Sequence, residues 1–205
     1  MDNLLDARIR QVYPTGRVWE IDESQLGQNN QATRLEQALG SVEKAFQLRI
    51  ALEPGDKLLH ALAITHAGDP AFHDWVFGMG NPEKAGWCNT NNCPYVVFWL
   101  RISRVADYYY FHYNHWKPRG DTGYMDTDHL MVANEAWKQY ERAICSNLQK
   151  QGFIMAPDEM LKQRISFVLE EGFDEIPDDD PRWDDEDYRP PLVPTSVYQC
   201  LFGDL

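Results

Sequence analysis

Aromatic and β-branched residues fill two runs, 95–103 and 108–116, on either side of the short polar break 104–107. Such runs around a polar break are typical of a β-hairpin. At the two-residue period of a strand, Val96, Phe98, Leu100 and Ile102 share one face of the first run. The opposite face carries Tyr95, Val97, Trp99 and Arg101. Since both faces are largely covered, we expect this hairpin at the centre of an antiparallel sheet.

Apolar residues spaced three or four apart predict two amphipathic helices. In the first, near 32–50, the apolar positions are Leu35, Leu39, Val42, Phe46 and Ile50. In the second, at 129–151, they are Leu130, Ala133, Trp137, Tyr140, Ile144 and Leu148. Asp126, Thr127 or Asp128 can cap the start of the second helix, and Gly152 is placed to end it.

Shorter segments complete the predicted fold. Residues 1–12 predict a helix and 17–21 a brief strand. The run 57–66 is ambiguous between helix and buried strand, and its Ala and Leu content favours helix. A further helix is expected from Ala156 with Met160, Ile165, Val168 and Leu169 on its apolar side, and a terminal strand at 195–202. The whole chain, 1–205, is therefore predicted to be a single α+β domain whose antiparallel sheet is flanked by helices.

The chain is strongly acidic, with a formal net charge of −13. Such a surface repels nucleic acid and anionic lipid and attracts basic partners. The first residues lack the basic region and apolar run of a secretion signal, and no stretch has the length of a membrane span. We therefore expect a soluble cytoplasmic protein, whose four cysteines are reduced thiols.

Most of the excess negative charge lies in one segment, an acidic loop predicted at about 170–189. Between Glu170 and Asp187 there are eleven acidic residues and one basic residue, Arg182. The segment is followed by a proline-rich stretch and the predicted terminal strand, so we expect it to be tethered at both ends. It is either a solvated loop or a partner-binding surface, and its interleaved aromatic residues favour the second. The expected partner-binding residues are Asp178, Asp179, Asp180, Trp183, Asp184, Asp185, Glu186, Asp187 and Tyr188.

A second group of residues could carry chemistry instead. The candidate metal set is His112, His115, Asp126, Asp128 and His129. Imidazole and carboxylate together suit zinc or iron, and such a site would make a small metal-dependent hydrolase. However, residues three apart in a regular strand point to opposite faces, which separates His112 from His115. We therefore expect no metal here.

The other usual signatures of catalysis are weak. Cys88 and Cys93, taken with Cys145 and Cys200, depart from the spacing of a four-cysteine zinc site. The sequence has neither a Gly-x-Ser-x-Gly nucleophile motif nor a phosphate-binding glycine loop. The expectation is a protein with no cofactor and no chemistry of its own.

The C-terminal third, roughly 130–205, resembles small cytoplasmic bacterial proteins that act as immunity partners of polymorphic or contact-dependent toxins. The resemblance is carried by Gly152-Phe153, by the helix start Ala156-Pro157-Asp158-Glu159, and by the closing segment from Val193 to Phe202. It implies an acidic protein of one domain, without enzymatic machinery, that occludes the active site of its cognate toxin.

The sequence thus favours an acidic binding protein, an immunity protein whose basic partner is a toxin or secreted effector. The alternatives are the small hydrolase and an adaptor or chaperone for a secreted effector. The neighbouring gene distinguishes them: a toxin or secretion gene favours a binding protein, and a metabolic operon favours the enzyme.

Overall fold

The computed structural model describes residues 3–27, 30–53, 57–66, 95–118, 125–130, 135–172 and 189–203. Its helices are α1 (Asn3–Val12), α2 (Gln31–Phe46), α4 (Glu135–Lys150), α5 (Asp158–Leu161), α6 (Val197–Phe202) and a short 3-10 turn at Glu23–Gln25. Its strands are β1 (Leu48–Glu53), β2 (Leu59–His66), β3 (Tyr95–Ser103), β4 (Tyr108–Pro118), β5 (Met125–Leu130), β6 (Ile154–Met155), β7 (Arg164–Glu171) and β8 (Leu192–Ser196). No helix in this part of the chain is long and apolar enough to cross a membrane.

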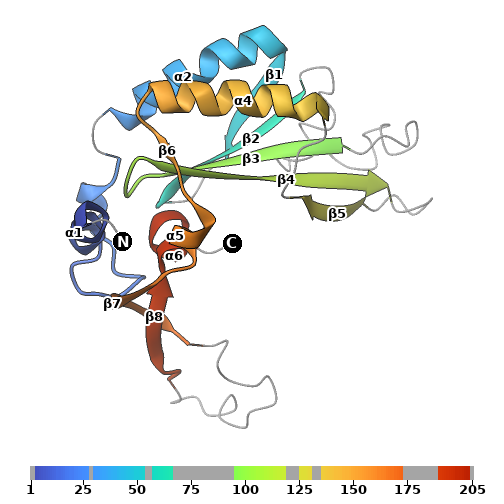
Figure 1. Ribbon diagram of the computed structural model, residues 1–205. Helices are drawn as coiled ribbons and strands as arrows, with labels where there is room; N and C mark the ends of the chain where they lie inside the picture. The colour runs from blue at the N-terminus through green and yellow to red at the C-terminus, as the bar shows by residue number, and fades with distance from the viewer. Residues whose placement is uncertain are drawn as a thin grey trace.

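The predicted α+β class is confirmed, with a large antiparallel sheet centred on the aromatic hairpin (Figure 1). Strands β1 to β5 lie in chain order, and β6 adds a short parallel pairing to β4. The hairpin β3–β4 is at its middle, with Phe98 opposite Tyr113 and Ile102 opposite Tyr109. A second, two-stranded sheet joins β7 to β8.

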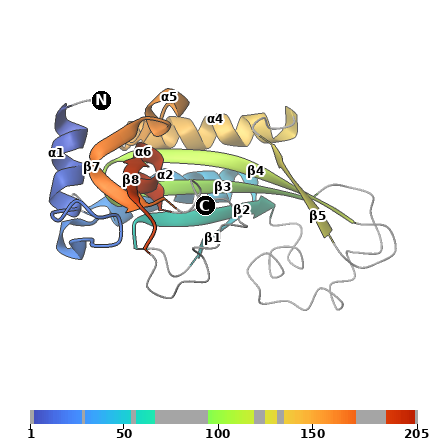
Figure 2. The ribbon, with the colours of Figure 1, turned by 90° about the horizontal axis from the view of Figure 1, so that it is seen from below.

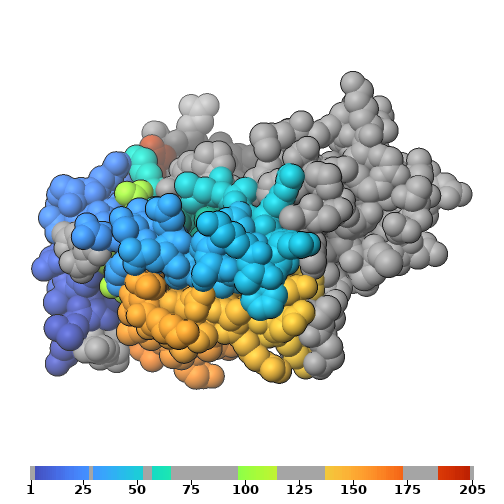
Figure 3. All heavy atoms as spheres, turned by 90° about the horizontal axis from the view of Figure 1, so that it is seen from above, coloured from blue at the N-terminus to red at the C-terminus, as the bar shows by residue number. Residues whose placement is uncertain are grey.

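The two long helices cover one face of the large sheet. In Figure 3, α2 and α4 lie side by side over that face, and Asn147 Nδ2 joins them by donating to Ala38 O at 3.1 Å. Beneath them lies the sheet core, formed by inward-facing residues of the strands and of both helices. Its largest members are Phe98, Tyr109, Tyr113, Trp137, Tyr140, Ile144, Leu148 and Phe153.

The other face carries the shorter elements. Seen from below in Figure 2, α6 and the β7–β8 hairpin lie across the strands, beside α1 and α5. They enclose a second cluster, the hairpin core, which draws residues from both ends of the chain. Its members include Leu5, Ile9, Val12, Tyr13, Ile165, Val168, Val197, Leu201 and Phe202. The β3–β4 hairpin therefore has buried side chains on both faces, such as Phe98 and Tyr113 on one and Val97 and His112 on the other, as its sequence predicted.

Several predicted boundaries were wrong because a backbone reversal or a pairing partner overrides local propensity. The helix predicted near 32–50 ends at Phe46, since Gln47 adopts a left-handed conformation (φ +52°), and Ile50 lies in strand β1, which begins at Leu48. The run 57–66 is a strand and not a helix. It is β2, which pairs with β1 and β3, and these two neighbours outweigh the helix propensity of its Ala and Leu residues.

The helix predicted at 129–151 is described from Glu135 to Lys150 as α4, and its predicted start at 129–130 is part of strand β5 instead. Asp126, Thr127 and Asp128 are not its caps, because they lie in β5, paired with β4. Its buried positions from Trp137 to Leu148 are confirmed, as is the left-handed Gly152 (φ +83°) after its end.

The C-terminal segments were also misassigned. The expected helix from Ala156 shrinks to the four residues of α5, and Ile165, Val168 and Leu169 belong to β7. The expected strand at 195–202 is mostly α6, whose N-cap Ser196 accepts a hydrogen bond from Gln199 N at 3.0 Å. The strand expected at 17–21 is a single bridge between Arg17 and Leu169.

Candidate functional site

The β7–β8 hairpin holds both ends of the acidic segment. Its last rung pairs Glu171 with Leu192, and beyond it Gly172 N donates to Pro191 O at 2.8 Å. The described residues on either side of 173–188 are therefore paired with each other, which is the tether at both ends that the sequence predicted. The predicted partner-binding residues, Asp178 to Asp180 and Trp183 to Tyr188, lie outside the described residues.

A third length of chain supports the hairpin from the side. Val18 N donates to Leu169 O at 3.0 Å, and Leu169 N donates to Gly16 O at 2.9 Å. Gly16 has φ +73°, and a Cβ there would lie 2.7 Å from Phe167 O. Only glycine satisfies both the left-handed backbone and this close approach.

The underside of the hairpin is fixed in the hairpin core. Ile165 and Val168 of β7 are buried against Val197 and Leu201 of α6. Tyr13, which follows α1, donates its hydroxyl to Cys200 O at 2.9 Å. The hairpin at the two ends of the acidic segment is thus packed against residues from both ends of the chain.

Two acidic residues at the hairpin have different roles. Glu170 accepts hydrogen bonds from Arg164 Nη1 at 2.8 Å and from Thr195 Oγ1 at 2.9 Å, so its carboxylate is already engaged within the hairpin. Glu171, one residue further along, is exposed. A partner surface on this hairpin would therefore begin at Glu171, with Glu170 holding the two strands together.

The register divides the residues of the possible metal site. His112 lies opposite Trp99 in β3, and Asn114 lies opposite His129 in β5, so His112 and His129 occupy positions of the same parity. His115 lies opposite Asp128, and Lys117 opposite Asp126, at the alternate positions. The regular strand thus separates these residues into two sets on opposite faces.

Among these residues only His112 has a described side chain. It is almost completely buried, with its ring centroid 6.3 Å from that of Tyr110. No three His, Cys, Asp or Glu gather as a metal-binding group in the described parts of the chain.

The described thiols are poor nucleophiles. Burial raises the pKa of Cys145 and raises that of Cys200 to about 12, so both stay protonated near neutral pH. Tyr113 donates its hydroxyl to Glu141 Oε2 at 2.8 Å, and burial together with this bond raises the pKa of the phenol. The Tyr113–Glu141 hydrogen bond therefore joins β4 to α4, whereas Cys200 belongs to the hairpin core.

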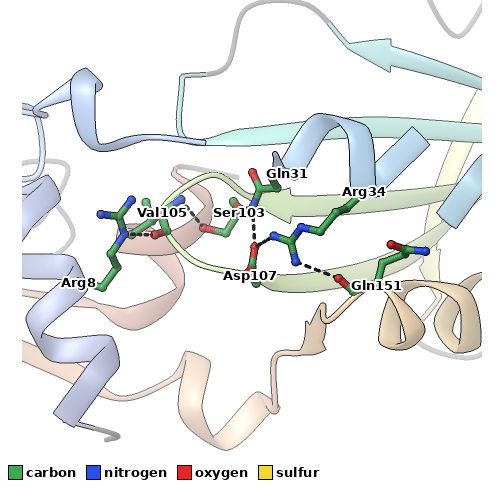
Figure 4. Close-up of polar contacts among 7 residues, drawn as sticks. All are labelled: Arg8, Gln31, Arg34, Ser103, Val105, Asp107 and Gln151. Carbon is green, nitrogen blue, oxygen red and sulfur yellow. Dashed lines mark hydrogen bonds and ion pairs between the residues drawn. The ribbon is translucent and has the colours of Figure 1, made fainter. Parts of the chain in front are cut away.

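One polar cluster in the structure was not predicted from the sequence. Arg34 of α2 pairs with Asp107 in the turn between β3 and β4, and its Nη1 donates to Gln151 O at 2.9 Å (Figure 4). Gln31 of the same helix donates to Ser103 O at 2.7 Å and to Asp107. Charge and helix position gave no signal of this pairing, because the partners are separated by 73 residues.

The cluster continues towards the hairpin core. Arg8 of α1 donates from Nε to Val105 O at 2.7 Å, and Val105 N is bonded to Ser103 Oγ at 3.1 Å (Figure 4). The β3–β4 turn is thus fixed to α1, to α2 and to the end of α4. This polar junction links the two cores of the molecule, and its side chains are committed to that structural role.

Comparisons with family models, with curated proteins and with solved structures found no match to this chain.

Proposed function

We propose that this protein is an acidic binding protein that neutralises a basic partner, and that the partner is a toxin whose active site it occludes. The observation that carries the proposal is the β7–β8 tether. The two strands of this hairpin are paired at the ends of the segment that contains most of the chain's excess negative charge, through the Glu171–Leu192 pair and the Gly172–Pro191 hydrogen bond.

A tethered acidic segment suits binding better than a free acidic tail does. Pinning both ends removes part of the conformational entropy that an ordering loop would otherwise lose on binding. Its charge accelerates encounter with a basic protein, and the aromatic residues within it can supply the contacts that keep the complex together. The likeness of the C-terminal third to immunity proteins favours a toxin among basic partners, and an adaptor role for a secreted effector would use the same surface.

The test begins with the product of the neighbouring gene. If that protein is a toxin, its expression should stop growth and co-expression of this chain should restore it. Association and dissociation rates of the purified pair are then measured at low and at high ionic strength. A neighbouring protein that is neither toxic nor bound by this chain would contradict the proposed function.

Two variants locate the surface. Neutralising Asp184, Asp185, Glu186 and Asp187 to Asn or Gln should slow association by roughly 10- to 1000-fold at low salt, with a smaller deficit at high salt. Trp183→Ala should mainly speed dissociation, because a buried anchor holds the formed complex. If both variants bind as the parent protein does, the acidic segment is not the interface.

A matched control variant loses the same four negative charges outside the acidic segment. It replaces four acids on α2 and α5, namely Glu36, Glu43, Asp158 and Glu159, by the corresponding amides. Association should slow much less in this control, because steering by charge is strongest close to the interface. An equal effect in both variants would show that net charge acts without a local surface.

A further inference from the structure

Strand β1 ends the large sheet. It pairs with β2 along all six of its residues without a bulge, and no other described strand pairs with its outer edge (Figure 1). Exposed edges are usually protected by charged side chains, lysine above all, or by proline, a bulge or a very short strand. The β1 sequence, Leu48 to Glu53, contains neither lysine nor proline, and its two charges, Arg49 and Glu53, are of opposite sign. The strand therefore keeps the features that permit pairing with another strand.

The apolar face of the sheet continues to this edge. Leu52 lies opposite the buried Leu62, on the side of the sheet that α2 and α4 cover, yet its own side chain is 56% exposed. Ile50, two residues earlier on the same side, is half-buried against the sheet core. With respect to the described strands, the β1 edge thus combines a row of unpaired backbone groups with an exposed leucine.

We propose that a second copy of this chain pairs with β1, antiparallel and centred on Ala51, to form a dimer with one continuous sheet. In this register Ile50 of each copy lies opposite Leu52 of the other, and Arg49 lies opposite Glu53. The strand is therefore self-complementary in both apolar contact and charge. A strand with this symmetry fits itself better than it fits an unrelated partner.

The geometry of the sheet selects this register. A twofold axis perpendicular to the sheet keeps the helix-covered faces of both copies on the same side, so opposed residues must have the same parity. Shifting by one step to centre on Ile50 places Arg49 opposite Ala51, and centring on Leu52 places Glu53 opposite Ala51. Only the register centred on Ala51 pairs opposite charges, and it also covers each Leu52 with an isoleucine.

Charge reversal tests the register directly. The parent protein should have the mass of two 23.8 kDa chains in light scattering or sedimentation. Arg49→Glu and Glu53→Arg should each be monomeric, because each variant opposes like charges at both ends of the paired strands. The double variant should dimerise again, since it restores two opposite pairs. An equimolar mixture of the two single variants should form a heterodimer.

Controls separate this surface from general effects. Lys162→Glu, an exposed residue of the segment after α5, makes the same charge change as Arg49→Glu and should leave the dimer intact. Leu52→Lys should dissociate the dimer while the circular dichroism spectrum stays that of the parent. A monomeric parent protein, or a dimer that survives both Arg49→Glu and Leu52→Lys, would overturn the proposal. Failure of the double variant and of the mixture to associate would overturn the register.

The outcome is independent of the proposed function. Dimerisation is read from mass, whereas the binding of a toxin is read from growth and from kinetics with the four-acid variant. Arg49→Glu changes neither the β7–β8 hairpin nor the acidic segment, so failure of one proposal leaves the other standing.

Discussion

The two cores of this protein are built differently. The sheet core is covered by two helices of 16 residues each and filled with aromatic rings, such as Phe98, Tyr113 and Trp137, in stacked and edge-on contact. The hairpin core joins short elements from the two ends of the chain. Its parts are held by backbone hydrogen bonds such as Val18 N to Leu169 O. Both cores bury apolar side chains, but aromatic rings dominate only the sheet core, and backbone hydrogen bonds between distant segments are a feature of the hairpin core.

This difference suggests that the two cores have different roles, one in the stability of the fold and the other in the position of the acidic segment. Large rings buried between a sheet and two helices each remove a large apolar area from water on folding. The hairpin core instead fixes where one segment leaves the fold, through the Gly16 approach and the Tyr13 hydroxyl. We therefore expect substitutions in the sheet core to act mainly on stability, and those in the hairpin core to act on the position of the acidic segment as well.

Trp137→Ala should have the largest effect on stability, because it removes a large side chain from the sheet core. Trp137 is buried, with its ring 5.3 Å from Tyr140 and 6.2 Å from Tyr113. Loss of its contacts and the cavity left behind should lower the free energy of unfolding by about 3–5 kcal/mol. Urea denaturation measures this.

The matched control is Trp19→Ala, since Trp19 is 45% exposed. Its effect should stay within about 0.5 kcal/mol. Equal losses in the two tryptophan variants would refute the assignment of Trp137 to the core.

Tyr13→Phe should have a smaller effect and would sharpen the comparison. It removes the hydroxyl that donates to Cys200 O and leaves that buried carbonyl without this donor. The expected loss of stability is about 1 kcal/mol, the usual range for one buried hydrogen bond. Hydrogen exchange should increase in α6 more than in α4, because the lost bond belongs to the hairpin core. Uniform acceleration across both helices would show that the two cores open together.

The pH dependence of stability should show the smallest effect. Burial lowers the pKa of His60 in β2 from its ordinary value of 6.5, and the nearby charge of Arg104 lowers it further. The unfolded chain therefore binds this proton more readily than the folded protein does. Stability contributed by neutral His60 is present above pH 6.5 and is lost as the pH falls from there towards the lowered folded value. His60→Gln should flatten that slope in denaturation curves, and an unchanged slope would contradict the assignment.

The same contrast explains which elements could be predicted from sequence. The hairpin at 95–116 and the buried positions of α2 and α4 are long enough for their period to show. By contrast, α5 and α6 have four and six residues, fewer than two helical turns, so periodicity cannot distinguish them from strands. The end of α2 before Gln47 could not be predicted either, because neither glycine nor proline stands at that position.

The candidate site was predictable only in part. Its tether followed from the composition on either side of the acidic run. The engagement of Glu170 depends on Thr195, which the fold brings to it across the hairpin. The polar junction around Arg34 and Asp107 likewise exists only after the β3–β4 turn has met α2. Pairings between residues distant in sequence leave no local pattern to read.

The hydrogen bond from Tyr13 to Cys200 O also has a consequence for synthesis on the ribosome. The apolar side of α1 emerges early, but the residues that cover it, Leu201 and Phe202, are translated much later. The hairpin core therefore cannot close while the intervening chain is being made, whereas α2 and α4 can pack earlier. We therefore expect Ile9 and Val12 to stay uncovered during that interval, and the hairpin core to be completed after the sheet core.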